Sequence, residues 1–165
     1  MLSFLEMNRS IITKHCTHFM FNKIFILLFI LAIALSCKKE KVVFDAVPII
    51  EFISITPSVA SQYTDSVTIT IKYSDGDGDL GQNDAIVKNC FIKDNRIGIV
   101  YDFRIRQLSP DNSSVPITGT LNLELGGQGI ADNSAQQNVS YTVYVVDRAG
   151  HKSNEITTSS IVIKQ

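Results

Sequence analysis

Val67-Thr68-Ile69-Thr70-Ile71-Lys72-Tyr73 is followed without a break by Ser74-Asp75-Gly76-Asp77-Gly78-Asp79-Leu80-Gly81. In the first half, apolar side chains alternate with Thr or Lys, the period of two that is typical of a strand with one buried face. In the second half, Asp alternates with Gly, which ends the strand and predicts a tight turn. The strand and its acidic turn together indicate a β-protein with a charged joint between two strands.

The acidic turn is a candidate calcium site. Calcium takes about six to eight oxygen ligands, and carboxylates separated by glycines supply such ligands while the chain wraps around the ion. Asp75, Asp77 and Asp79 have the spacing that starts an EF-hand loop. However, Leu80 stands where that loop needs glycine, and Ile86 stands where it needs a bidentate glutamate. We therefore expect a different calcium loop, whose further ligands come from other turns.

The first such partner that we expect is Asp147, in the turn Asp147-Arg148-Ala149-Gly150, and Asp84 or Asn83 are further candidates. The alternative is that Asp and Gly only form the turn of a solvated hairpin. A turn needs one or two such residues, whereas three like charges placed this closely repel one another, so calcium is the preferred interpretation. The ion would have a structural role, with an affinity of about 10⁻⁴ to 10⁻³ M as in extracellular modules.

Outside this turn the chain has no helical periodicity and reads as short strands between turn residues. The expected strands lie at 49–55, 67–73, 90–93, 97–105, 121–125, 139–145 and 156–163. In the fourth of them, the alternating row from Ile97 to Ile105 is expected to be buried. About seven short strands with short connections predict an all-β fold, a single Ig-like Greek-key sandwich of the fibronectin-III or cadherin-like kind.

The chain has no tryptophan, and Cys90 is its only cysteine inside the expected domain. The disulfide and core tryptophan of antibody domains therefore cannot occur here. We expect Cys90 to be a buried structural thiol.

The N-terminal part contains an unbroken apolar run at 24–35, preceded by Lys23 and followed by Ser36-Cys37. The run is too short to cross a bilayer, which takes about 20 residues, and is typical of a signal peptide. Ala34-Leu35-Ser36-Cys37 resembles the lipobox of bacterial lipoproteins, which implies cleavage before Cys37 and lipidation of its thiol. An ordinary signal peptide or an uncleaved anchor is the alternative.

These features predict three parts: a signal region at 1–36, a lipidated tether at 37–47 and a sandwich domain at 48–165. Residues 1–19 fit no signal pattern, so Met20 is a second candidate for the start of translation. The part after the signal is mildly acidic, which leaves no electrostatic basis for binding nucleic acid.

Four segments together resemble small surface or outer-membrane lipoproteins of Bacteroidota: the lipobox with Cys37-Lys38-Lys39-Glu40, Ile53-Ser54-Ile55-Thr56-Pro57, the acidic turn, and the segment 146–154. The resemblance implies a location at the outer membrane, on its periplasmic or its surface-exposed face. It also implies an Ig-like domain, and it says little about activity.

Catalysis has little support in the sequence. His151 is the only histidine after Cys37, and it shares a turn with Asp147 without a nucleophile elbow. We expect a non-enzymatic lipoprotein whose sandwich serves binding or structural spacing at the outer membrane, held by the lipid on Cys37, with a protein or glycan partner. The alternative is a carbohydrate-binding accessory of a surface glycan-uptake assembly, for which Tyr144 and Tyr63 are the candidate binding residues.

Overall fold

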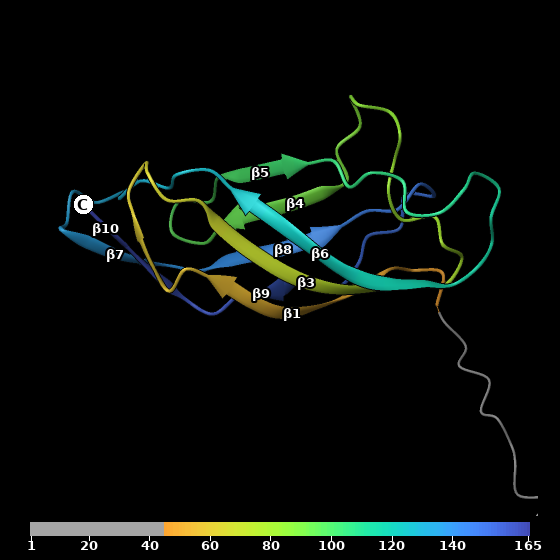
Figure 1. Ribbon diagram of the computed structural model, residues 1–165, viewed down its shortest axis with the longest axis horizontal. Helices are drawn as coiled ribbons and strands as arrows, with labels where there is room; N and C mark the ends of the chain where they lie inside the picture. Colours follow the sequence, from red (N-terminus) through yellow and green to blue (C-terminus); the bar gives the residue numbers. More distant parts are fainter. Residues whose placement is uncertain (1–44) are drawn as a thin grey trace, which may run out of the picture. The chain divides into compact units, whose positions relative to one another are not determined.

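The computed structural model describes residues 45–165, which form an all-β domain with no helix in that range (Figure 1). The strands are β1 (Ile49–Thr56), β2 (Val59–Ser61), β3 (Val67–Asp75), β4 (Cys90–Asp94), β5 (Val100–Phe103), β6 (Ile117–Leu125), β7 (Gln136–Val139), β8 (Tyr141–Val145), β9 (Ile156–Thr157) and β10 (Ile161–Lys164). The expected signal region, the second start Met20 and the lipidation site Cys37 lie outside the described residues. In 45–165, no helix long and apolar enough to cross a membrane is found.

The strands form three sheets with the orders β1-β3-β6, β5-β4-β8-β9 and β2-β10-β7. Neighbouring strands are antiparallel, except that β2 runs parallel to β10. The buried side chains of all three sheets belong to one hydrophobic core, which is consistent with the predicted sandwich.

The inward rows of two strands lead to the acidic end of the domain. In β3 the row of Val67, Ile69 and Ile71 is fully buried and continues through Tyr73 to a buried Asp75. The corresponding row of β8, from Tyr141 to Val145, continues in the same period to the buried Asp147. Burial of each large apolar side chain stabilises the fold by roughly 1.5–3 kcal/mol, and this fixes the register that also turns both carboxylates inward.

The predicted strands are found in part, with five differences. The segment 139–145 divides between β7 and β8, and the segment 156–163 divides between β9 and β10, in each case in different sheets. The row from Ile97 to Ile105 is not buried throughout: the chain turns at Asn95–Ile97, Gly98 has φ 75°, and Ile97 and Ile99 remain about half exposed. β5 therefore begins only at Val100. β6 begins earlier than predicted, at Ile117. β2 was not predicted, because three residues are too few for a period to show.

Asp45, which the sequence analysis assigns to the tether at 37–47, is bonded to the domain. The main-chain amide of Gly76 donates a hydrogen bond to the carbonyl of Asp45, at 2.8 Å. The start of the domain and the acidic turn therefore lie at the same end of the sandwich.

Candidate metal centre

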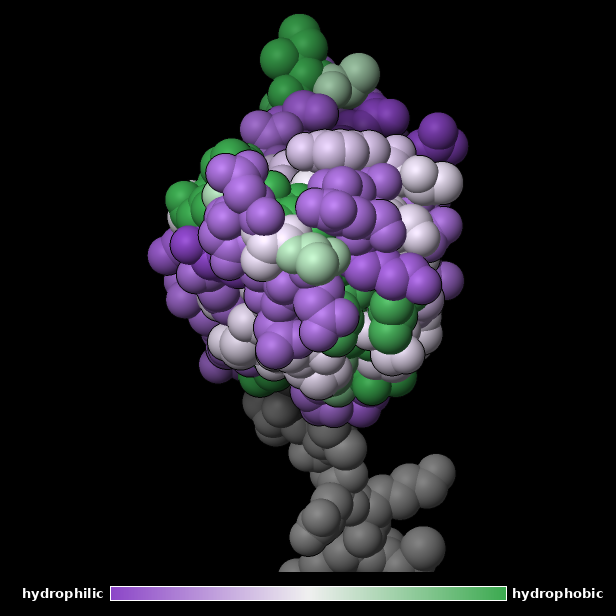
Figure 2. All heavy atoms as spheres, turned by 90° about the vertical axis from the view of Figure 1, so that its left-hand side faces the viewer, coloured by the Kyte–Doolittle hydropathy of each residue, from purple (hydrophilic) through white to green (hydrophobic). Residues whose placement is uncertain are grey.

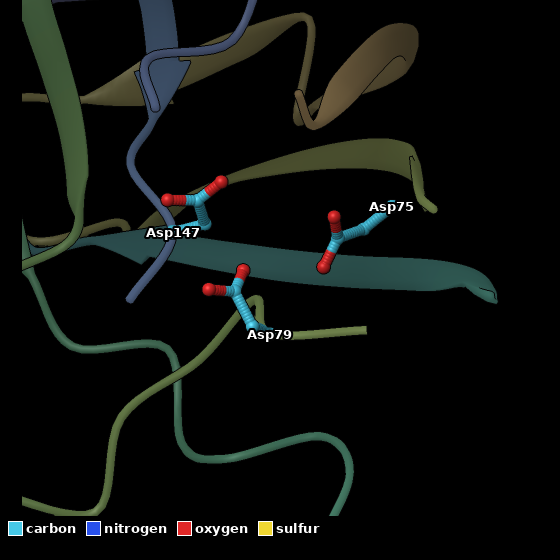
Figure 3. A group of neighbouring side chains, drawn as sticks. All are labelled: Asp75, Asp79 and Asp147. Carbon is cyan, nitrogen blue, oxygen red and sulfur yellow. The ribbon is translucent and has the colours of Figure 1, made fainter. Parts of the chain in front are cut away.

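Three carboxylates from two parts of the chain converge at this end. Asp75 ends β3, Asp79 lies in the turn that follows, and Asp147 follows β8; Figure 3 shows their side chains directed towards a common space. One oxygen of each lies within 4.8 Å of the others. Because calcium binds oxygens at about 2.3–2.6 Å, oxygens on opposite sides of the ion are about 5 Å apart. The three carboxylates therefore fit a single coordination sphere.

Main-chain amides orient these carboxylates. Oδ2 of Asp75 accepts a hydrogen bond from the amide of Leu80 at 2.7 Å, and Oδ2 of Asp79 accepts one from the amide of Ala149 at 2.9 Å. The second bond joins the acidic turn to the turn after β8. In that turn, Oδ1 of Asp147 accepts from the amide of His151 at 2.7 Å. One oxygen of each carboxylate is thereby fixed by the backbone.

The remaining oxygens of the acidic turn have no partner. Oδ1 of Asp75, of Asp77 and of Asp79 are each buried, and none accepts a hydrogen bond from the described residues. Leaving a buried polar atom unsatisfied costs about 1–3 kcal/mol, and more when the group is charged. Three such atoms within one turn form the oxygen-rich set that a hard cation prefers. Asp77 lies in the same turn, and its charge adds to burial in raising the pKa of both Asp75 and Asp79.

The pKa values of the site reflect a shortage of positive charge. Burial raises the pKa of Asp75 to about 6; the Leu80 amide opposes this, while the charges of Asp77 and Asp79 add to it. Burial also raises the pKa of Asp79, with the charge of Asp147 as the next contribution. At neutral pH the site therefore holds carboxylates whose charge the protein itself compensates poorly.

A second buried carboxylate in the same domain, that of Asp94, has its negative charge neutralised by a neighbouring cationic side chain. Asp94 is as deeply buried as Asp75, but the guanidinium of Arg96 donates to both of its oxygens, with Nη2 to Oδ2 at 2.6 Å. Arg96 also donates to Gly129 O and Gln137 Oε1, so further hydrogen bonds fix the position of its guanidinium. Asp75 lacks any such cationic partner among the described residues, which distinguishes the acidic end from an ordinary buried ion pair.

The acidic turn is not a solvated hairpin, which was the alternative interpretation of the sequence. Gly78 has φ 74° and Gly81 has φ 95°, and a Cβ atom on either would lie 2.2 or 2.3 Å from a main-chain oxygen of the segment 106–115. The hydroxyl of Ser109 donates to the carbonyl of Gly78. The turn is therefore covered by the segment 106–115, and its glycines are required by that close approach.

The sequence-predicted ligands separate into two groups. Asp75, Asp79 and Asp147 are brought together, and Asp77 has a buried Oδ1 in the same turn, whereas Asp84 is exposed and its Oδ1 accepts a hydrogen bond from the amide of Ile86. Asn83 is also exposed. Asp84 lies in the loop beyond the turn, where it forms a local turn of its own. The prediction of Asp84 as a ligand is therefore not supported by its position.

His151 and Asp147 form a hydrogen-bonded pair, with Nδ1 to Oδ2 at 2.9 Å. The nearest hydroxyl in sequence does not complete a catalytic set. Ser153 Oγ donates to the carbonyl of Asn154 and accepts from the amide of Val145, so it is engaged by the backbone. The pair instead fixes the carboxylate of Asp147.

The two tyrosines considered for carbohydrate binding differ in accessibility. The ring of Tyr144 stacks on Phe91 with centroids 4.9 Å apart, and Lys152 Nζ lies 4.0 Å from its centroid. The ring of Tyr144 is therefore already in contact with a neighbouring ring and an ammonium group. Tyr63 is 73% exposed and lies against the backbone of Gly127 and Gly129.

No protein-family model matches this chain, and neither a curated protein nor a solved structure matches it.

Proposed function

We propose that this chain is a non-enzymatic lipoprotein of the cell envelope, whose calcium-stabilised β-sandwich serves binding or structural spacing at the outer membrane. Cys37 would carry the lipid, and a protein or a glycan at the cell surface would be the partner. The domain would be of the Ig-like, fibronectin-III or cadherin-like kind. The sheet orders β1-β3-β6 and β5-β4-β8-β9, which require the chain to cross between sheets, support a Greek-key topology.

The observation that carries the calcium proposal is the set of three buried, unpartnered oxygens, Oδ1 of Asp75, Asp77 and Asp79. A calcium ion would compensate their charge and that of Asp147, and would tie the turn after β3 to the turn after β8. Because only the folded domain brings these groups together, binding would stabilise it by mass action.

Calcium titration of the domain at residues 38–165 tests this proposal. At ten times the dissociation constant, one site contributes about 1.4 kcal/mol, which raises Tm by several degrees for a domain of this size. Magnesium should have a smaller effect, because it requires a stricter geometry and loses its water reluctantly.

Terbium luminescence reports the same site directly. Terbium replaces calcium chemically, and Tyr73, two residues before Asp75 in the same inward row, would transfer excitation energy to it. We expect a terbium signal that calcium displaces and that Asp77→Ala loses. An unchanged Tm at millimolar calcium, together with no terbium signal, would exclude a calcium site.

Carbohydrate binding is the second candidate function, and the exposure of Tyr63 is the observation that favours it. Its exposed ring could stack on a sugar, whereas the ring of Tyr144 already contacts Phe91 and Lys152. A glycan-array signal that Tyr63→Ala abolishes and Tyr144→Ala leaves unchanged would establish this function. A signal insensitive to Tyr63→Ala would assign binding to another surface.

A further inference from the structure

β6 is a long edge strand of the sheet β1-β3-β6 (Figure 1). It pairs with β3 in one continuous register along its whole length, and with no other strand of the described residues. An edge strand presents unpaired main-chain donors and acceptors, which natural proteins protect with short strands, bulges, prolines, charges or a covering segment. β6 has nine residues without proline, lysine or bulge, and Glu124 is its single charged residue. This edge therefore lacks the usual protection.

The other edges in the described part of the chain are better protected. β1, at the opposite edge of the same sheet, has a register shift between Phe52 and Ser54. The side chain of Asn154 also bonds to the amide and the carbonyl of Ile50, at 2.8 and 2.9 Å. β5 and β9 have only four and two residues. β2 and β7 have three and four, and lie at the end of the domain that Figure 2 shows, where hydrophilic residues prevail.

The bonds between Asn154 and Ile50 also indicate which groups of β6 face its free edge. Successive residues of a strand direct their main-chain groups to opposite sides. Because Ile50 faces away from β3, its partner Tyr73 directs its main-chain groups towards β6, where it pairs with Gly119. Alternation then assigns the free groups to Thr118, Thr120, Asn122 and Glu124. None of these main-chain groups bonds to a residue within 45–165.

We propose that β6 pairs antiparallel with β6 of a second copy of this chain, about a two-fold axis at Leu121. In this register all of β6 overlaps with its counterpart, whereas a shift along the strand would leave residues at both ends unpaired. Each residue that faces the free edge lies opposite another such residue, so every free donor meets a free acceptor. The result is a continuous sheet across both copies, in the order β1-β3-β6-β6-β3-β1.

The outward side chains of β6 suit this register. Thr118 lies opposite Glu124 of the second copy, so no like charges meet. Thr120 lies opposite Asn122, a pair that can form a hydrogen bond between a hydroxyl and an amide. A bond of this kind already joins β3 to β6, where Thr70 Oγ1 donates to Asn122 Oδ1 at 3.0 Å. The outer face of β6 is therefore complementary to itself.

The core-facing side chains of β6 gain burial in the same arrangement. Leu123 and Leu125 are buried, whereas Ile117 and Leu121 pack against the core but remain partly exposed. Leu121 meets its counterpart at the axis in a non-hydrogen-bonded pair, the type in which opposite side chains lie closest. Removal of this apolar area from water favours association. The inference requires neither the lipid nor the calcium ion of the proposed function.

The experiment measures the mass of the full chain in a nonionic detergent by sedimentation equilibrium. Thr120→Lys/Asn122→Lys places lysine opposite lysine in the paired register, and Thr120→Glu/Asn122→Glu places glutamate opposite glutamate. An equimolar mixture of these two variants places lysine opposite glutamate. Glu51→Lys/Ile53→Lys is the matched control, because it adds two exposed lysines to β1, at the other edge of the same sheet.

We expect the unchanged chain and the β1 control to form dimers. Each double variant of β6 should raise the dissociation constant by at least about tenfold, because two like-charged pairs meet in each dimer. The mixture should restore the dimer. Circular dichroism of each variant reports folding separately.

Amide exchange followed by NMR tests the same pairing without any substitution. The amides of Thr120 and Asn122 should exchange more slowly as the concentration of the chain rises. Those of Gly119 and Leu121, which bond to β3, should not depend on concentration.

An unchanged chain that stays monomeric up to millimolar concentration would overturn the inference, and so would a dimer that neither β6 variant weakens. A mixture of folded variants that remains monomeric would also overturn it. If a variant unfolds, the exchange measurement decides, and amides of Thr120 and Asn122 that do not respond to concentration would refute the pairing. Protection of these amides only after addition of other envelope proteins would refute it in favour of a strand from another protein.

Discussion

Asp75 occupies the last inward position of β3, where the same period that buries Val67, Ile69 and Ile71 places a carboxylate. The residue cannot turn outward without a shift of the strand register, which would expose the whole apolar row. The core therefore fixes the register of β3, and this register keeps the carboxylate of Asp75 buried. The only group that compensates its charge is the main-chain amide of Leu80, and no cationic side chain among the described residues pairs with it.

Replacement of Asp75 by Asn should have opposite effects with and without calcium. In calcium-free buffer, Asp75→Asn should raise Tm, because a neutral amide removes a buried charge that two neighbouring carboxylates repel. In calcium, the variant should lose most of the stabilisation that the wild type gains, because a ligand with full charge is missing. Thermal unfolding followed by circular dichroism measures both effects.

Asp84→Asn is the control for this substitution, because Asp84 is exposed and lies outside the cluster. It should respond to calcium like the wild type. Equal calcium stabilisation of Asp75→Asn and Asp84→Asn would contradict the assignment of Asp75 as a ligand.

The raised pKa of Asp75 predicts an unusual dependence of stability on pH. Its pKa is about 6 in the folded domain and 3.8 in the reference state, so the folded state binds more protons between these values. Without calcium, the free energy of unfolding should therefore rise as pH falls from 7 towards 4, by about 1.4 kcal/mol for each unit of pKa difference that is titrated.

Calcium should weaken or reverse this trend, because protons compete with the ion for the same oxygens. Urea unfolding at pH 7 and pH 5, with calcium and with a chelator, measures both parts. A calcium-free domain that loses stability on mild acidification would contradict the raised pKa of Asp75.

At the scale of the element, the acidic turn combines a positive φ with a tight backbone contact. Gly81→Ala would place a Cβ atom 2.3 Å from the carbonyl oxygen of Arg106, in addition to the strain of φ 95°. We expect a loss of about 3 kcal/mol and a weaker response to calcium, since the turn must move away from the segment that covers it. Urea unfolding and the calcium titration measure the two effects.

Gly98→Ala separates strain from contact. Gly98 also has a positive φ, of 75°, but no atom lies within 4 Å of the position that its Cβ would take. Its substitution should cost about 1 kcal/mol and leave the calcium response unchanged. Similar losses at both positions would show that the contact between the turn and the segment 106–115 contributes little.

At the scale of the whole molecule, the two ends of the domain are held together by different means. The end with β2, β7 and β10 is braced by the buried Asp94–Arg96 pair, whose guanidinium also bonds to the loop after β6. At the acidic end, the turns after β3 and β8 are joined by the Asp79 carboxylate and by two hydrogen bonds that Arg148 donates to main-chain carbonyls, and the carboxylates that meet there have no buried ion pair of this kind. In the export that we propose, a domain without an internal disulfide would gain stability from a metal at such a junction.

Membrane attachment is the prediction that concerns the whole chain. Cys37→Ser should move the protein from the membrane fraction to the soluble fraction, because attachment through two or more acyl chains would be lost. Cell fractionation with immunoblotting measures this, and Cys90→Ser, at a buried thiol inside the domain, is a control that should remain in the membrane fraction. Membrane retention of Cys37→Ser would contradict lipidation.

Several features of the fold follow from local patterns in the sequence. The alternation in β3, β6 and β8 predicts these strands because one-sided burial imposes a period of two. The same argument fails for Ile97 and Ile99, which continue the period of β5 in sequence but lie in the loop between β4 and β5. It also fails for β2, which forms only because β10 is available to pair with it. Whether a short segment becomes a strand depends on a partner that local sequence does not specify.

In the candidate site, too, some features follow from the local sequence and others depend on tertiary packing. The sequence by itself determined the strand at 67–73 and the acidic turn after it, because periodicity and turn chemistry are local properties. Only the tertiary structure decided that Asp147 meets this turn while Asp84 does not, and that three oxygens are buried without partners. Burial and convergence depend on how the sheets pack, which brings together residues far apart in the chain.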